Sequence, residues 1–176
     1  MCDCCNFIAA RGGRPNDPAL LAEYERILRF RIRANLDARG VSLMGVEGWP
    51  PFSYTIGLTA IGHPELVIFG LEPQICQPIL NEIADYVIFQ DMRIGSGDEV
   101  DVANWRFLSI AVPNPADVVV RANDFYRRPA HNSVPALQLV YPDVHGVWPW
   151  EPHCHLFPGQ QPLPGEFPGA DEPRSA

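Results

Sequence analysis

The sequence contains no lysine, so all 13 of its basic side chains are arginines, and 21 acidic residues leave a net charge of −8. The negative net charge argues against nucleic-acid binding, because phosphate contacts require clustered arginine and lysine. No hydrophobic run approaches the length of a membrane span, and the first residues lack the apolar stretch of a signal peptide. We therefore expect neither a nucleic-acid partner nor a membrane, and a cytoplasmic location.

Cysteine is scarce and unevenly placed. Three of the five cysteines fall within the first five residues, "MCDCC". An odd number of cysteines in a chain with no export signal does not indicate a disulfide framework, and it favours a reducing compartment.

Hydrophobic residues make up 47% of the 176 residues and charged residues 19%, which is typical of a globular protein. This length predicts one domain with a core large enough to fold without cross-links. We place that domain at residues 1–156. Residues 157–176 contain five prolines and three glycines, and we expect this C-terminal tail to be partly disordered.

Three segments have helical patterns. The first runs from Asn16 to Gly40, where Asp17 suits the N-cap, Pro18 the first helical position and Gly40 the C-terminal exit. A second helix is expected over about 72–86, starting at Gln77 or kinked there because Pro78 removes a hydrogen bond. A short third helix is expected near 115–126.

Short β-type runs occur at 41–47, 52–58, 65–71, 106–112 and 136–143, with a further candidate at 147–152. The first three follow one another through short links, so they are expected to pair antiparallel. The predicted fold is α+β: a single, mostly antiparallel sheet with two to three helices packed on it.

Several blocks resemble one known family. Cys2 and Cys5 at the start, "PPFSYTIGLT" (50–59), "GHPELVIFGL" (62–71), "ILNEIA" (79–84) and "LQLVYPDVHGVWPWEP" (137–152) occur in the order found in the bacterial domain of unknown function 4262. The chain departs from that pattern at Cys4 and at "HCH" (153–155). The resemblance implies a domain type and no particular reaction.

The cysteines and histidines at the two ends suggest a metal site. Cys2 and Cys5 have C-x-x-C spacing, and His153 and His155 alternate on a segment that, if extended, points both toward one side. If the chain ends meet, these four residues are the expected ligands of zinc or another transition metal, with Cys4 and Cys154 as alternates. We therefore expect the N-terminus to pack beside residues 148–155. A redox pair at Cys2 and Cys5, or an N-terminal nucleophile at Cys2 after removal of Met1, are the other hypotheses.

A second set of residues could line a ligand pocket. Tyr54, Thr55, His63, Gln138 and Trp148 combine aromatic surface with polar groups, as ligand sites and protein cores both do. His63, at a turn between two strands, could act as an acid, a base or a metal ligand, or could stabilise a strand end. Cys76 fits the apolar face of the second helix and is expected in the core.

The leading functional hypothesis is a domain that binds a metal ion or small ligand through the N-terminal cysteines and the C-terminal histidines. The alternatives are a non-catalytic protein-interaction module, which could form a homodimer, and a metal- or thiol-dependent enzyme. Composition and motifs do not decide whether the protein is an enzyme.

Overall fold

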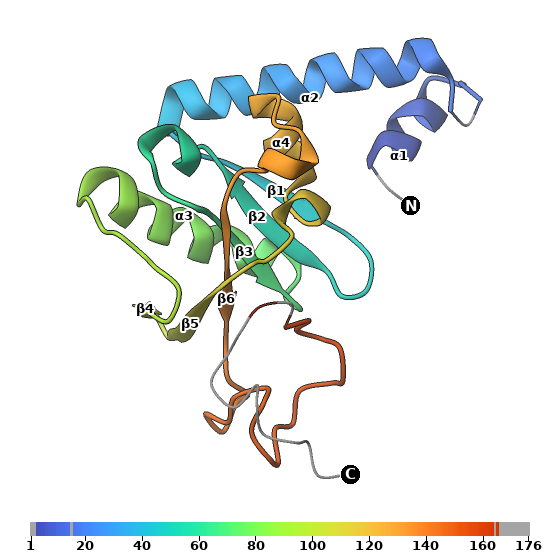
Figure 1. Ribbon diagram of the computed structural model, residues 1–176. Helices are drawn as coiled ribbons and strands as arrows, with labels where there is room; N and C mark the ends of the chain where they lie inside the picture. Colours follow the sequence, from blue (N-terminus) through green and yellow to red (C-terminus); the bar gives the residue numbers. More distant parts are fainter. Residues whose placement is uncertain (1–2, 15, 164, 166–176) are drawn as a thin grey trace.

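Helices and runs of one to three strands follow one another along the chain. The structure, a computed structural model, describes residues 3–14, 16–163 and 165 (Figure 1). The α-helices are α1 (Asp3–Ala10), α2 (Pro18–Arg39), α3 (Pro73–Phe89) and α4 (Val120–Tyr126). The strands are β1 (Ser42–Val46), β2 (Phe52–Ile56), β3 (Glu65–Phe69), β4 (Glu99–Val102), β5 (Trp105–Ala111) and β6 (Ala136–Val140). Three short 3-10 helices are η1 (Leu58–Ile61), η2 (Pro115–Asp117) and η3 (Ala130–Asn132).

The strands form one mixed sheet in the order β1-β2-β3-β6-β5-β4. Every neighbouring pair is antiparallel except β3 and β6, which are parallel. Tyr54 lies opposite Val67 in the antiparallel β2–β3 pair, as expected from the short links between the early strands. The prediction of an α+β fold with a mostly antiparallel sheet is confirmed.

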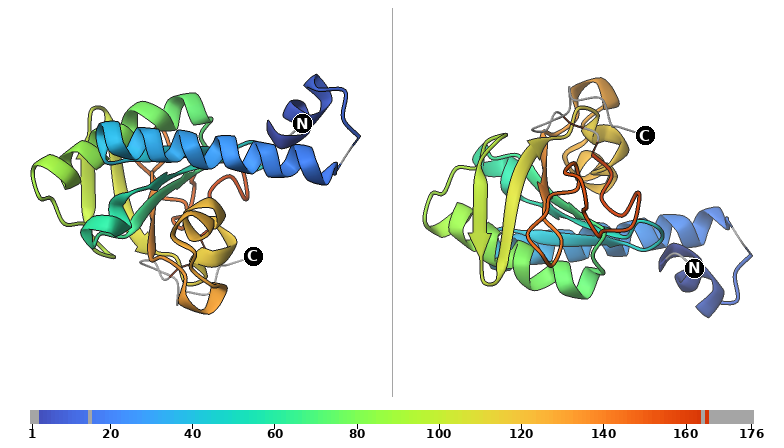
Figure 2. Two further views of the ribbon diagram at one scale, coloured as in Figure 1. Left: turned by 90° about the horizontal axis from the view of Figure 1, so that it is seen from above. Right: turned by 90° about the horizontal axis from the view of Figure 1, so that it is seen from below.

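Two layers cover the sheet. Helix α3 packs on one face through an apolar stripe, and α4 with the C-terminal half of α2 packs on the other (Figure 2). Alternation along β2 separates the two sides, because Tyr54 and Ile56 point toward the α2 and α4 layer. The segment after β6 covers the remainder of that second face, where Trp148, Trp150 and Leu163 pack on β5 and β6.

The signals that predicted the long helix act as expected. The Asp17 carboxylate accepts hydrogen bonds from the backbone N–H groups of Ala19 and Leu20, at 3.0 and 3.2 Å. Pro18 begins α2, and Gly40 ends it in the left-handed conformation at φ 76°. These caps satisfy backbone groups that a helix end otherwise leaves unpaired.

The helix count of two to three was wrong, since the described residues contain four α-helices. The missed element is α1, whose Phe7 ring lies 5.4 Å from that of Tyr24 on α2 and whose Ile8 is buried. Packing on α2, rather than a strong sequence signal, stabilises this short helix. Of the two alternatives predicted for the second helix, the start at Gln77 was wrong, because α3 begins at Pro73 and continues through Pro78.

The C-terminal segment docks on the sheet beyond the expected domain end at residue 156. Gln160 donates to Gly70 O, and Gln138 on β6 donates to Pro162 O. Gln161 is buried and bonds both backbone groups of Tyr141. The segment at 147–152 is not a strand, and residues 99–102, where no strand was predicted, form edge strand β4. The expected disorder falls mainly on residues 166–176, which lie outside the described part of the chain.

Replacing Gln161 with alanine is expected to lower the free energy of unfolding by about 2 kcal/mol. Its amide accepts from Tyr141 N at 3.1 Å and donates to Tyr141 O at 2.8 Å, so both backbone groups lose a partner in a buried setting. Urea unfolding measures the change, and Gln77→Ala, at an exposed position of α3, serves as the control. Equal stability of the two variants would show that the docked segment contributes nothing.

Candidate functional site

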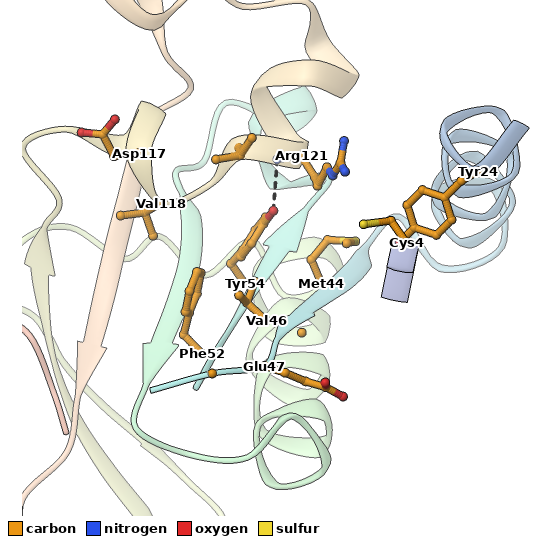
Figure 3. A pocket seen from close by; sticks show the side chains of 13 residues that line it. Cys4, Tyr24, Met44, Val46, Glu47, Phe52, Tyr54, Asp117, Val118 and Arg121 are labelled. Atoms are coloured by element: carbon orange, nitrogen blue, oxygen red, sulfur yellow. Dashed lines mark hydrogen bonds between the residues drawn. The ribbon is translucent and has the colours of Figure 1, made fainter. Parts of the chain in front are cut away.

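A cleft of about 400 Å³ lies beside the β1–β2 edge of the sheet (Figure 3). Its floor consists of two cross-strand pairs, Met44 opposite Tyr54 and Val46 opposite Phe52. One wall comes from η2 and the start of α4, and the facing wall from α1 and α2. The lining residues are Cys4, Tyr24, Met44, Gly45, Val46, Glu47, Gly48, Phe52, Tyr54, Asp117, Val118, Val120 and Arg121.

Tyr54 fixes the floor of this cleft to the α4 wall. Its hydroxyl accepts a hydrogen bond from the backbone N–H of Arg121 at 3.1 Å (Figure 3), and its side chain is 1% exposed. Burial raises the pKa of Tyr54 to about 12, so the phenol is neutral at physiological pH. The ring also stacks on Phe52 with centroids 6.1 Å apart. Tyr54 is therefore a rigid, buried support for the half-buried Phe52 on the cleft floor.

The rim of the cleft carries more negative than positive charge that is not compensated by an ion pair. The Arg121 guanidinium forms ion pairs with Glu25 at 2.8 Å and with Asp124 at 3.2 Å. Glu47 and Asp117 are exposed at the rim and add two carboxylates. Because the arginine is already paired with two carboxylates outside the cleft, the rim is acidic on balance.

Of the five residues proposed as ligand contacts, only Tyr54 lines this cleft. Thr55 lies at the end of β2, where its hydroxyl donates to Glu65 at 2.7 Å and accepts from Leu66 N at 2.8 Å. Gly57 N and Thr59 N donate to the other oxygen of Glu65. Thr55 thus belongs to the support of a fully buried carboxylate and not to a ligand site.

His63 is buried, and both ring nitrogens have backbone partners. Nδ1 donates to Pro64 O at 2.7 Å, and Nε2 accepts from Ile94 N at 3.1 Å. Burial lowers the pKa of His63, with Arg93 acting in the same direction, so the ring is neutral. This arrangement matches the structural reading, in which His63 stabilises the start of β3 and the loop after α3.

Gln138 and Trp148 lie with the docked C-terminal segment. Gln138 donates to Pro162 O at 2.8 Å, and Trp148 stacks on Trp150 with ring centres 5.2 Å apart. The Arg106 guanidinium lies 5.5 Å from the Trp148 ring centre. These contacts hold the segment on β5 and β6, away from the cleft.

The predicted metal ligands are not brought together in the described residues. Cys4 and Cys5 lie on α1, which packs on α2, whereas His153, Cys154 and His155 lie in the segment after β6 at the other end of the molecule (Figures 1 and 2). Among residues 3–14, 16–163 and 165, no group of three or more histidine, cysteine, aspartate or glutamate side chains could hold a metal ion. The expected packing of the N-terminal segment beside residues 148–155 is wrong for α1, because Phe7 and Ile8 bury on α2 instead.

The other cysteine predictions have mixed outcomes. Cys2 lies outside the described residues, so its proposed roles in metal binding, redox chemistry or catalysis stay predictions. Cys76 is fully buried, as expected, and burial raises the pKa of its thiol to about 11. Cys4, predicted as an alternate metal ligand, instead lines the cleft, and its sulfur points into it opposite Met44 (Figure 3).

A second polar centre, absent from the sequence predictions, is Asp143. Its carboxylate accepts backbone hydrogen bonds from His145, Val147 and His155, and the His155 ring lies 3.1 Å away. The backbone hydrogen bond from His155, followed by those from Val147 and His145, holds the pKa of Asp143 well below its usual range. The D-x-H-G spacing at a turn is the signal that could have identified this acceptor.

Met44, Val46, Asp117 and Arg121 are among the cleft residues that sequence reasoning missed. Alternation on the β1 and β2 segments could have placed Met44 and Val46 on the face of Tyr54, because antiparallel neighbours share a face. Asp117 and Arg121 come from a connection far along the chain, and no local pattern links them to the first hairpin.

Within the described residues, no helix is both long and apolar enough to cross a bilayer. The family model for a domain of unknown function (DUF4262) matches residues 35–155, which include all six strands, α3 and α4. No curated protein and no solved structure shows significant similarity to the chain. Because the match spans more than half of the sequence, the chain belongs to the DUF4262 family.

Proposed function

We propose that this domain binds a small aromatic molecule with a positive charge in the cleft beside β1 and β2. The observation that carries this proposal is the combination of an aromatic and thioether floor with an acidic rim. The cleft's volume of about 400 Å³ is in the range of small-molecule sites, which are concave, mostly apolar and contain a few polar groups.

The floor favours a flat, apolar ligand. The half-buried Phe52 presents its ring, which stacks on the buried Tyr54, and the flexible, polarisable thioether of Met44 adapts to the edge of an aromatic group. Because Tyr54 is held by Arg121 N, this surface is ordered before a ligand arrives. A preorganised floor lowers the entropic cost of binding.

The rim favours a cation. Glu47 and Asp117 are the carboxylates nearest the opening, whereas the charge of Arg121 is compensated by Glu25 and Asp124. The net charge of −8 adds a long-range field of the same sign. A cation above the half-buried Phe52 would also gain a cation–π interaction.

The test uses two probes with the same ring and opposite charges, tryptamine and indole-3-propionate. Tryptamine is expected to bind with measurable heat in calorimetry and to raise the melting temperature, and indole-3-propionate is expected to bind at least fivefold more weakly. The acidic rim attracts tryptamine and repels indole-3-propionate, which sets the direction of the preference. The difference in affinity is modest because each exposed carboxylate contributes only a few tenths of a kcal/mol to about 1 kcal/mol. Equal affinity for the two probes, or no binding of either, would contradict the proposal.

Matched variants identify the site. The double variant Glu47→Gln and Asp117→Asn should weaken tryptamine binding about fivefold, whereas Asp101→Asn, on the opposite edge strand, should leave it unchanged. Val46→Trp should fill the cleft and abolish binding, whereas Val144→Trp, at a site 93% exposed, should not. Tryptamine should also slow alkylation of Cys4, measured by peptide mass, more than that of Cys5, which is exposed on α1 and does not line the cleft.

A further inference from the structure

The segment after β6 folds around a buried carboxylate. Asp143 Oδ1 accepts from His145 N and Val147 N, both at 2.9 Å, and Oδ2 accepts from His155 N at 2.8 Å. The side chain is only 2% exposed. These bonds join two parts of the chain that are 12 residues apart and fix the positions of His145 and His155.

His155 is held in one orientation by the same carboxylate. Its Nδ1 lies 3.1 Å from Asp143 Oδ2, and since a carboxylate only accepts, Nδ1 is the protonated nitrogen. Nε2 is therefore the nitrogen with a lone pair, on a ring that is 66% exposed. Histidines that bind metals are commonly held in this way, because a carboxylate bonded to one nitrogen orients the other and raises its basicity.

The His145 ring lies against the His155 ring at a distance suited to a shared ion. Their centroids are 5.0 Å apart and their planes are inclined by 65°. With a metal–nitrogen bond of about 2.1 Å, an imidazole centre lies about 3.2 Å from the metal, and two such rings on a tetrahedral ion have centres about 5 Å apart. The two rings form an edge-to-face contact, and their spacing is also compatible with two imidazoles on one tetrahedral ion.

We propose that His145 and His155 form a two-imidazole site for a divalent transition-metal ion, with Asp143 as its positioning residue. Imidazole nitrogens suit zinc, copper and nickel, which are the expected class of ion. The hydrogen bonds of Asp143 use both of its oxygens, so the carboxylate orients a ligand and is not one itself. Two protein ligands leave coordination positions open for water or an added ligand, in keeping with the lack of a three-residue group among the described residues.

This site differs from the one predicted from the sequence, and it does not depend on the proposed cleft function. The earlier prediction paired His155 with His153 on an extended segment. His153 instead has φ 71° in a turn and lines a separate hollow with Cys154 and Glu151. His145, which the sequence prediction omitted, occupies the place expected for His153.

Titration of the full reduced chain with Zn²⁺, followed by calorimetry, tests the proposal. His145→Ala and His155→Ala are each expected to weaken zinc binding at least tenfold, since each removes one of two ligands. His131→Ala, an exposed histidine on η3, and His153→Ala should retain the affinity of the original chain. Both ligand positions are exposed, so these variants are expected to fold.

Three results would overturn the site: zinc binding unchanged in His145→Ala and His155→Ala, binding lost in His153→Ala, or no zinc binding at all. Loss of binding only on replacement of Cys2 and Cys5 by serine would place the metal at the N-terminal cysteines instead.

The role of Asp143 has its own readout in the metal-free protein. The ring ¹⁵N shifts of His155 should report the Nδ1–H tautomer, and Asp143→Asn should change the tautomer ratio while weakening zinc binding about tenfold. An unchanged tautomer ratio would reject the positioning role.

Discussion

Replacing Glu65 with leucine is expected to lower the free energy of unfolding by about 3 to 5 kcal/mol. The Glu65 carboxylate is fully buried and accepts from the Thr55 hydroxyl at 2.7 Å, Gly57 N at 3.0 Å and Thr59 N at 3.1 Å. Leucine fills a similar volume but leaves these donors without a partner, and each buried unpaired donor costs about 1 to 3 kcal/mol. Urea unfolding at pH 7 measures the loss. The control is Glu47→Leu, an exposed position expected to change stability by less than about 0.5 kcal/mol.

The same carboxylate gives stability a defined pH dependence. Burial raises the pKa of Glu65 above its ordinary 4.5, and the donors from Thr55, Thr59 and Gly57 only partly offset this. The folded state therefore binds the proton more tightly than the unfolded state, and stability falls as pH rises from about 4.5 through the raised pKa. The stability of the original chain relative to Glu65→Gln should decline over that window, because glutamine does not titrate. A relative stability that rises with pH would show that the hydrogen bonds outweigh burial.

The parts of the fold that sequence reasoning predicted are those with local causes. Asp17, Pro18 and Gly40 determine the ends of α2 through backbone groups within a few residues, so the signal and the structure coincide. The strands around Tyr54 and Val67 alternate in hydrophobicity and follow a short link, which determines both their type and their antiparallel pairing.

The two elements that were missed, α1 and β4, have different causes. Helix α1 has eight residues, too few to be stable alone, and exists because Phe7 and Ile8 pack on α2. Strand β4 is a short edge strand that forms a hairpin with β5 through Ala103 and Asn104. Val100 and Val102 are buried and Glu99 and Asp101 are exposed, so the alternation of a half-buried strand is present but only four residues long. The contact of α1 with α2, in contrast, is not visible in a local pattern.

The candidate site was predicted only in part, because the contacts that form it join residues far apart in the sequence. Tyr54 was identified from its strand, but its hydrogen-bond partner Arg121 is 67 residues away in the sequence. The metal hypothesis assumed that His153 and His155 alternate on an extended strand. A turn at His153 removes that alternation, and the buried Asp143 instead sets His145 beside His155. The spacing of the histidines thus pointed to the segment of the metal site that we propose, but to His153 in place of His145.

Gly57→Ala is expected to cost about 4 kcal/mol or more, the largest effect of any single-methyl change considered. Gly57 has φ 141°, a conformation that side chains rarely adopt, and an added Cβ would lie 2.3 Å from Gly40 O and 2.7 Å from Leu36 Cδ2. Strain of about 1 to 3 kcal/mol and overpacking of similar size add together here. Because Gly57 N also donates to Glu65, any shift of this residue weakens the buried carboxylate as well.

Gly62→Ala is the matched control for this prediction, since it adds the same methyl group in the same connection between β2 and β3. Gly62 also has positive φ, 75°, but nothing lies within 4 Å of the added Cβ. Only the backbone strain of about 1 to 2 kcal/mol is then expected. Urea unfolding of both variants separates steric overlap from strain. Equal losses would show that α2 and the end of β2 move apart without cost, and that the close approach of Gly57 to Gly40 does not hold this corner of the fold together.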